Sequence, residues 1–153
     1  MFKRQEFSSK LFDQNNFYTN FINDLKEAKK QVLIESPFMT TRRINRLLPV
    51  LHRLTKHGVR VIVNTKPLNE HEGVYKGQAR TCVGALQEID VIVLMTVGHH
   101  RKLSIIDEEI TWEGSLNILS QNDSCEIMRR ITSNQVAKDL IKFVHLDRFQ
   151  EIE

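Results

Sequence analysis

The chain has 153 residues, of which 41% are hydrophobic and 27% are charged, and its formal net charge is +3. These fractions are ordinary for one soluble globular domain. No apolar run approaches the length of a membrane span, and residues 1–6 lack the apolar core of a secretory signal, so we expect a cytoplasmic protein without stable membrane association. Cys82 and Cys125 have neither CxxC nor His-paired spacing, which predicts no zinc site and no disulfide framework.

The first half of the chain predicts alternating helices and strands. Residues 1–13 mix charged and aromatic residues and are compatible with a short strand or an arm. Apolar residues recur at helical spacing over 15–30, and a buried strand follows over 31–36, which Pro37 ends. A second amphipathic helix runs from Thr40 or Thr41 to His57, with a kink or break expected at Pro49. Residues 59–63 form the next apolar strand.

The second half continues this alternation and then changes to a hairpin. Residues 66–77 predict a surface loop, 78–88 a helix and 91–95 a strand. A hairpin with its second strand at 110–113 follows, then a helical turn or short helix at 118–123 and a strand at 126–131. Thr132 and Gln135 predict a capping box for a last helix with apolar contacts from Val136, Leu140, Phe143 and Val144. The whole pattern predicts an α/β fold, an αβα sandwich with a central mixed β-sheet, as one domain over 1–153.

Charge is distributed unevenly along the chain. Seven basic residues and no Asp or Glu lie between Ser36 and Asn69. Four of them fall within an arc of about 80° on the second helix, opposite its apolar face: Arg42, Arg46, Arg53 and Lys56. This asymmetry favours a polyanionic partner and predicts a nucleic-acid-binding surface. On charge alone, an ordinary solvated face explains the pattern equally well.

The residues with chemical potential gather between His99 and Glu126. Read as a strand with a period of two, the stretch after Gly98 projects His100, Lys102 and Ser104 from one face. An imidazole beside an ammonium group suits the binding and attack of a phosphate. The return strand at 110–113 delivers Gly114 and Ser115, and Asn117 follows. By the same geometry, His99 faces the other way and is expected to be a packed or partly exposed histidine.

This segment resembles the signature of the phospholipase D superfamily, His-x-Lys-x4-Asp-x6-Gly-Ser-x-Asn. Its six positions are His100, Lys102, Asp107, Gly114, Ser115 and Asn117, and Glu126 stands where many members carry an acidic residue. The resemblance implies hydrolysis through a phosphohistidine on His100. Lys102 would neutralise phosphoryl oxygens, Ser115 and Asn117 would donate hydrogen bonds, and Glu126 would hold the histidine tautomer. Asp107 lies at an odd offset from His100, so we assign it, with Gly114, a structural role.

A single copy of the motif is similar to the single-motif nucleases of the superfamily. We therefore expect a metal-independent endonuclease without cofactors, acting on DNA rather than RNA, as a homodimer that shares one active site. It would fit within a larger restriction or repair system. Two alternatives stay open: a phospholipid phosphodiesterase, and a nucleic-acid-binding module of a restriction, repair or helicase system with little turnover.

Overall fold

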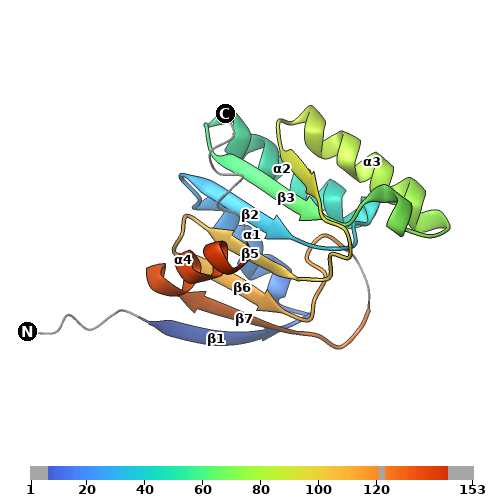
Figure 1. The fold of residues 1–153 in the computed structure, drawn as a ribbon. Coiled ribbons are helices and arrows are strands. Elements are labelled where there is room, and N and C mark those ends of the chain that lie inside the picture. The colour runs from blue at the N-terminus through green and yellow to red at the C-terminus, as the bar shows by residue number, and fades with distance from the viewer. Residues whose placement is uncertain (1–6, 121–122, 145–153) are drawn as a thin grey trace, which may run out of the picture.

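A seven-stranded mixed sheet forms the centre of the molecule (Figure 1). The structure is a computed structural model and describes residues 7–120 and 123–144. The strand order is β1-β7-β6-β5-β2-β3-β4. Strands β2, β3 and β4 run parallel, and the other neighbouring pairs are antiparallel. The strands are β1 Ser8–Asp13, β2 Gln31–Glu35, β3 Arg60–Thr65, β4 Ile92–Met95, β5 Leu103–Ile106, β6 Ile110–Gly114 and β7 Ile127–Thr132.

Helices cover both faces of this sheet, so the predicted αβα sandwich with a mixed sheet is confirmed (Figure 1). Helices α1 (Phe17–Lys26), α2 (Thr41–Lys56) and α3 (Val74–Glu88) share one face, and α4 (Asn134–Phe143) lies on the other. Alternate residues of β2 enter different cores, as the period of a strand requires. Val32 and Ile34 pack in the larger core with α1, α2 and α3, whereas Leu33 packs in the smaller core with Ala137 and Ile141 of α4.

Several predicted elements differ in detail from the structure. Helix α2 runs without a break through Pro49, which lies on its exposed side. Helix α3 begins at Val74, within the predicted loop, which also contains the 3₁₀ turn η1 (Leu68–Glu70). The described part of 118–123 forms a turn and no helix.

The last helix also differs from its prediction. Its N-cap is Ser133, whose hydroxyl accepts a hydrogen bond from Val136 N, so the Thr132–Gln135 capping box was wrong. Phe143, predicted to pack, has 78% of its surface exposed, because Ala137 and Ile141 are the residues that face the sheet. Val136 and Leu140 are therefore only partly buried, at the edge of the helix face formed by Ala137 and Ile141, and Phe143 lies outside that face.

The carboxyl ends of β2, β3 and β4 meet at one end of the sheet, where ligands commonly bind in open α/β sheets. Hydrogen bonds join the segments that leave these strands. Thr65 Oγ1 donates to the carbonyl oxygen of Pro37 at 3.2 Å, and Thr96 N donates to the carbonyl oxygen of Thr65 at 2.9 Å. The segment 96–102, which leads from β4 to β5 and carries the motif histidine, is thereby placed at this end.

Candidate active site

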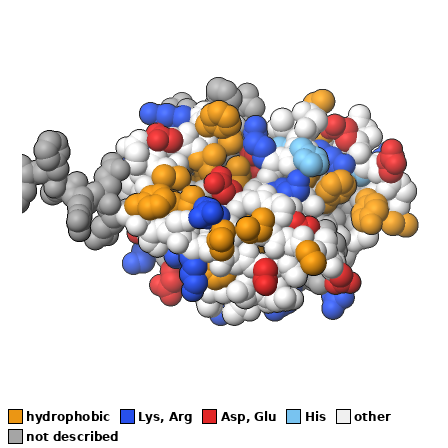
Figure 2. Space-filling view, turned by 90° about the horizontal axis from the view of Figure 1, so that it is seen from below, with side chains coloured by type: hydrophobic (Ala, Val, Ile, Leu, Met, Phe, Trp, Pro, Cys, Tyr) orange, Lys and Arg blue, Asp and Glu red, His pale blue; other side chains and the backbone are white. Residues whose placement is uncertain are grey.

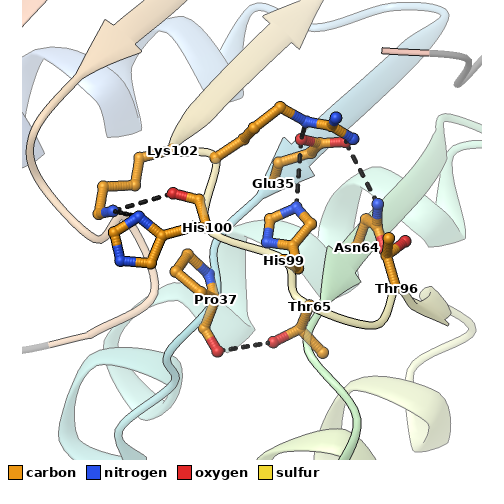
Figure 3. Close-up of polar contacts among 9 residues, drawn as sticks. Glu35, Pro37, Asn64, Thr65, Thr96, His99, His100 and Lys102 are labelled. Carbon is orange, nitrogen blue, oxygen red and sulfur yellow. Dashed lines mark hydrogen bonds and ion pairs between the residues drawn. The ribbon is translucent and has the colours of Figure 1, made fainter.

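His100 and Lys102 lie in the loop just before β5, since the strand begins only at Leu103. Lys102 Nζ donates to the carbonyl oxygen of His100 at 2.9 Å and lies 3.4 Å from its ring Nδ1 (Figure 3). The expectation that Ser104 shares their face was wrong, because Ser104 lies within β5, is fully buried, and donates to the carbonyl oxygen of Leu33 at 2.9 Å. The structure thus presents an exposed imidazole with an ammonium group beside it.

Burial lowers the pKa of the Lys102 ammonium, while the Glu126 carboxylate acts in the opposite direction. The nearby Glu126 carboxylate favours the charged form of this side chain. Lys102 is therefore available as a cation for a phosphoryl oxygen next to the His100 ring.

Gly114 lets two segments of the motif approach closely. A Cβ atom at this position would lie 2.1 Å from the carbonyl oxygen of Ile127 and 2.9 Å from Met128 Cα, so no larger residue fits without moving the backbone of β7. Ser115 N donates to the same Ile127 oxygen at 2.9 Å, and Ser115 Oγ accepts from Ile127 N at 3.0 Å. Glycine thereby fixes the place of the Ser115 hydroxyl against β7.

Glu126 lies on the Ser115 side of the site. A hydrogen bond from Ser115, one from Ser124 at 2.5 Å, and the charge of Lys102 hold the pKa of the Glu126 carboxyl below its usual value. Among the described residues, the two serines bind this carboxylate, Lys102 acts on it through its charge alone, and the His100 ring contacts Lys102. Glu126 therefore has no direct bond to His100 in this structure.

Asn117 is not among the residues that line the groove with His100. Its carbonyl oxygen accepts from Tyr18 Oη at 3.3 Å and from Ser120 N at 3.0 Å. Its side-chain Oδ1 is buried and has no hydrogen-bond partner within the described part of the chain. The structure therefore brings His100, Lys102 and Ser115 together in one groove, with Glu126 beside Ser115.

A groove of about 620 Å³ contains the motif residues and is apolar along much of its length. His100, Lys102 and Ser115 line one part of it. Its apolar lining is Leu11, Leu103, Ile127, Leu140, Phe143 and Val144. Leu11, Ile127 and Phe143 are 51%, 53% and 78% exposed. Figure 2 shows hydrophobic side chains spread over the surface seen from below, with histidine and basic side chains close together toward its right end.

Asp107 lies at the opposite end of β5 from His100. Its carboxylate accepts hydrogen bonds from the backbone N–H groups of Lys29, Lys30 and Gln31 at 2.8, 2.8 and 2.9 Å. Asp107 and Glu108 have φ values of 54° and 52°, as the two central residues of a type I′ turn do. The acidic member of the motif therefore ties the β5–β6 turn to the start of β2.

His99 is packed inside the protein, with 5% of its surface exposed. Its Nε2 lies 3.1 Å from Glu35 Oε2, and Arg101 also binds Glu35. Neither Glu35 nor Arg101 was predicted to belong to the site. The available signal was a single carboxylate in the apolar run Val-Leu-Ile-Glu-Ser directly before Pro37, which is an unusual place for an unpaired charge.

The four basic residues of α2 are all exposed and follow the length of the helix, and Arg46 and Arg53 line one pocket. A helix of 16 residues is about 24 Å long, so its two ends are far apart. Arg46 lines a polar pocket with Tyr18, Leu116 and Ser120, next to the motif. Arg53 lines a pocket with Ala28 and Lys29, near the Asp107 turn. Arg42 lies one turn from Arg46, and Lys56 lies near Arg53.

The residues that the structure describes contain no group of three or more His, Cys, Asp or Glu side chains placed to hold a metal ion. None of the helices there is both long and apolar enough to cross a bilayer.

Solved structures with this fold include Nuc, NucT and a phosphatidylserine synthase. Nuc from Salmonella typhimurium, a phospholipase D family member, has a TM-score of 0.74 at 15% identity, over 95% of this chain and 96% of Nuc. NucT from Helicobacter pylori has a TM-score of 0.69 at 18% identity, over 90% and 93% of the two chains. The phosphatidylserine synthase of Haemophilus influenzae has a TM-score of 0.65 at 15% identity, over 95% of this chain and 39% of the synthase.

No curated protein matches the sequence. A family model does match it, over residues 21–147, and that model describes the PLD-like domain of cardiolipin synthase. The match includes the whole motif from His100 to Asn117 as well as β2, α2 and β7. The chain therefore belongs to the family of cardiolipin synthase PLD-like domains, within the phospholipase D superfamily of phosphodiesterases.

Proposed function

We propose that the protein is an endonuclease that hydrolyses phosphodiester bonds of nucleic acid, DNA in preference to RNA. The observation that carries this proposal is the exposed His100 imidazole beside the Lys102 ammonium, in the same groove as Ser115. A nucleophile, a fixed cation and a hydroxyl donor are the groups that phosphoryl transfer requires.

In the proposed reaction, His100 Nε2 attacks phosphorus, a P–N bond forms, and the bond to the leaving oxygen breaks. Attack through Nε2 requires the ring proton on Nδ1, and Lys102 then keeps only its bond to the His100 carbonyl oxygen. Lys102 and Ser115 bind the phosphoryl oxygens, with the Asn117 amide as a further donor. Water then attacks the phosphohistidine and gives its proton to the imidazole that protonated the leaving oxygen, the P–N bond breaks, and the His100 imidazole is released. Glu126 orients Ser115, and its negative charge favours the positive charge that the His100 ring gains when the P–N bond forms.

A second imidazole is needed to protonate the leaving oxygen. His99 does not serve, because it is buried against Glu35. We propose that His100 of a second copy of the chain supplies the proton, in a homodimer with one site on its two-fold axis. The apolar lining of the groove beside His100, including Leu11, Ile127 and Phe143, would then be covered by the second copy.

A nucleic-acid substrate is supported by two observations. Exposed arginines stand at the motif end of α2, where Arg42 and Arg46 would contact backbone phosphates. The names Nuc and NucT of two solved structures with this fold agree with a nuclease. A role in a restriction or repair system and a cytoplasmic location belong to the same proposal, and the two free cysteines suit a reducing compartment.

A phospholipid phosphodiesterase is the second candidate, and the apolar groove next to His100 favours it. Acyl chains would lie along the groove while the headgroup phosphate met His100 and Lys102. The family description and the phosphatidylserine synthase fold agree with this reading.

The deciding experiment offers the wild type and His100→Ala equal amounts of single-stranded DNA, double-stranded DNA, RNA and cardiolipin vesicles, with and without EDTA. We expect the wild type to cleave DNA equally well with and without EDTA. The His100→Ala variant should cleave none. Headgroup release from vesicles without DNA cleavage would favour the lipid enzyme. DNA binding without cleavage would indicate a binding module, and activity restored by metal after EDTA would contradict the mechanism.

The shared site has its own test. Wild type and His100→Ala are refolded together at varied ratios. If two imidazoles are needed, activity falls as the square of the wild-type fraction, because only wild-type pairs are active. A linear fall, or full activity in a sedimenting monomer, would show that each chain works alone.

A further inference from the structure

Glu35 stands at the carboxyl end of the central strand β2 and is fully buried. Arg101 binds it through two parallel hydrogen bonds, Nε to Oε2 at 2.6 Å and Nη2 to Oε1 at 2.9 Å. Asn64 Nδ2 also donates to Oε1 at 3.2 Å, and His99 Nε2 lies 3.1 Å from Oε2. All of the groups around this carboxylate are donors. Burial opposes its ionisation, but the bonds from His99 and Arg101 prevail and lower the pKa of Glu35 to about 2.

The two loop residues that Glu35 holds are the immediate neighbours of His100 in the chain. Figure 3 shows the His99 ring directed to Glu35, while the His100 ring points to the other side of the loop, toward Lys102. Because the side chains of His99 and Arg101 are both bound to Glu35, the backbone between them, which carries His100, is held from both sides.

Lys102 Nζ donates to the His100 carbonyl oxygen at 2.9 Å, but both residues belong to the loop, and few other bonds tie this segment to the rest of the protein. In the described residues, His99 N donates to the carbonyl oxygen of Thr96 at 3.2 Å, and Gly98 N donates to Glu70 Oε1 at 2.9 Å. Both bonds are formed on the β4 side of His100. The first backbone bond after it, from Gly114 N to the carbonyl oxygen of Lys102, is long at 3.4 Å. The Arg101–Glu35 pair is thus the strong attachment on the β5 side.

The Arg101–Glu35 pair is also connected to β3 by hydrogen bonds of Asn64. Asn64, which donates to Glu35, accepts at its Oδ1 a hydrogen bond of 2.9 Å from Thr96 Oγ1, at the start of the loop. The carboxylate therefore connects β2 and β3 with both ends of the segment 96–101. A two-bond arginine–carboxylate pair sets direction as well as distance, because both groups are planar.

We propose that Glu35 is the positioning residue of the nucleophile: through Arg101 and His99 it holds the loop so that the His100 imidazole projects into the groove beside Lys102. Its effect on turnover rests on the proposed phosphodiesterase function, whereas its effect on the orientation of His100 does not. Glu35 does not touch the substrate.

The test uses Glu35→Gln, Arg101→Gln and the double variant. Arg101 has 43% of its side chain exposed, so its replacement leaves the core intact. Asp24→Asn is the matched control, because Asp24 accepts the same kind of fork from Arg130, at 2.8 and 2.9 Å, away from the loop. Turnover is measured on bis(p-nitrophenyl) phosphate, and the His100 imidazole is followed by NMR, assigned with His100→Ala.

We expect Glu35→Gln to lower kcat about 100-fold with KM changed less than about 2-fold, since misplacing a reacting group by about 1 Å has that effect. Arg101→Gln should lower kcat about 10-fold, and the double variant should be no worse than Glu35→Gln, because both act through one contact. Split or broadened His100 ring signals should accompany the loss. Asp24→Asn should keep both kcat and the His100 signals.

Equal losses in Glu35→Gln and Asp24→Asn would overturn the proposal, because a general loss of stability would then explain them. Unchanged His100 ring signals in a folded Glu35→Gln protein would overturn it as well, as would single-variant effects that multiply in the double variant. If the wild type hydrolyses no phosphodiester, the proposed function fails instead. The NMR signals of His100 then decide the inference about Glu35 alone.

Discussion

The β5–β6 hairpin carries motif residues at both of its ends, and the two ends are built in opposite ways. At the turn, the Asp107 carboxylate accepts three backbone hydrogen bonds of 2.8–2.9 Å and leaves little for a ligand. At the open end, His100 is exposed, and its ring has one long contact of 3.4 Å to Lys102. One sequence motif therefore contains both an architectural anchor and a reactive pair.

The difference teaches that membership in a motif does not imply contact with the substrate. Asp107 and His100 lie at opposite ends of the four-residue strand β5, which is about 13 Å long. Asp107 fixes the position of the β5–β6 turn, and the positions of His100 and Lys102 follow from that of β5. We call the end of the hairpin that carries His100 the site end, and the end that carries Asp107 the turn end.

The largest effect is expected at the site end from His100→Ala. Without a nucleophile, kcat should fall about 10⁴-fold or more. His99→Ala should cost less than about 10-fold, because the Arg101 fork on Glu35 remains, while it lowers stability by about 1–3 kcal/mol. Steady-state kinetics and thermal unfolding of both variants measure this contrast. Equal losses of kcat would show that the two histidines are not divided into a reactive and a packed one.

Lys102 offers a test of the site end by pH. Because burial lowers the pKa of its ammonium, Lys102 loses its proton at a lower pH than an ordinary lysine, and activity should fall as pH rises through that pKa. Arginine stays charged across this range. Lys102→Arg should therefore lower kcat at neutral pH about 10-fold or more but remove the alkaline fall. A pH–rate profile that keeps the same alkaline limb in Lys102→Arg would assign the limb to another group.

The basic residues of α2 can be divided between the two ends. The pair Arg42→Gln/Arg46→Gln should weaken DNA binding about 10-fold and reduce the dependence of affinity on salt, because these residues lie beside the motif. The pair Arg53→Gln/Lys56→Gln removes the same charge near the turn end and should change affinity less than about 2-fold. Fluorescence anisotropy at several salt concentrations gives both values. Equal weakening would mean that DNA follows the whole length of α2.

The smallest effect on turnover is expected at the turn end. Asp107→Ala removes the acceptor of three backbone N–H groups and should destabilise the fold by about 2 kcal/mol. The folded fraction should keep kcat within about 2-fold, because the site end is untouched. Glu108→Ala is the control, since it shares the positive φ but has one long side-chain bond of 3.5 Å, from Gln31 Nε2. A folded Asp107→Ala protein without activity would show that the two ends are coupled.

Periodicity was enough to predict the sandwich, because β2 and β3 are continuous apolar runs and α2 has a clear apolar face. The motif spacing also located His100, Lys102 and Ser115 in one groove. Strand periodicity failed at Ser104, because the chain does not enter β5 until Leu103, and an alternation rule holds only inside a strand. The same rule succeeded for His99, which lies just outside β5 yet points inward.

Long-range contacts were beyond the reach of the sequence. Glu35 meets Arg101 across 66 positions of the chain, and no local pattern links the two. The prediction of the N-cap of α4 failed for a different reason. Thr132 and Ser133 are both good N-caps, and the choice between them was made by the sheet, because Thr132 is the last residue of β7 and pairs with Ser8 and Ile110.

The sheet order also has a consequence for biosynthesis. The first strand, β1, pairs with the last, β7, with Ser8 opposite Thr132. Contacts between such distant segments form late, because a long loop must close before they are made. During translation, β1 stays unpaired until β7 has been made, and until then Gly114 and Ser115 lack the Ile127 backbone against which they lie. The groove around His100 is therefore completed only after β7 has been synthesised, although His100, Lys102 and Ser115 are made before it.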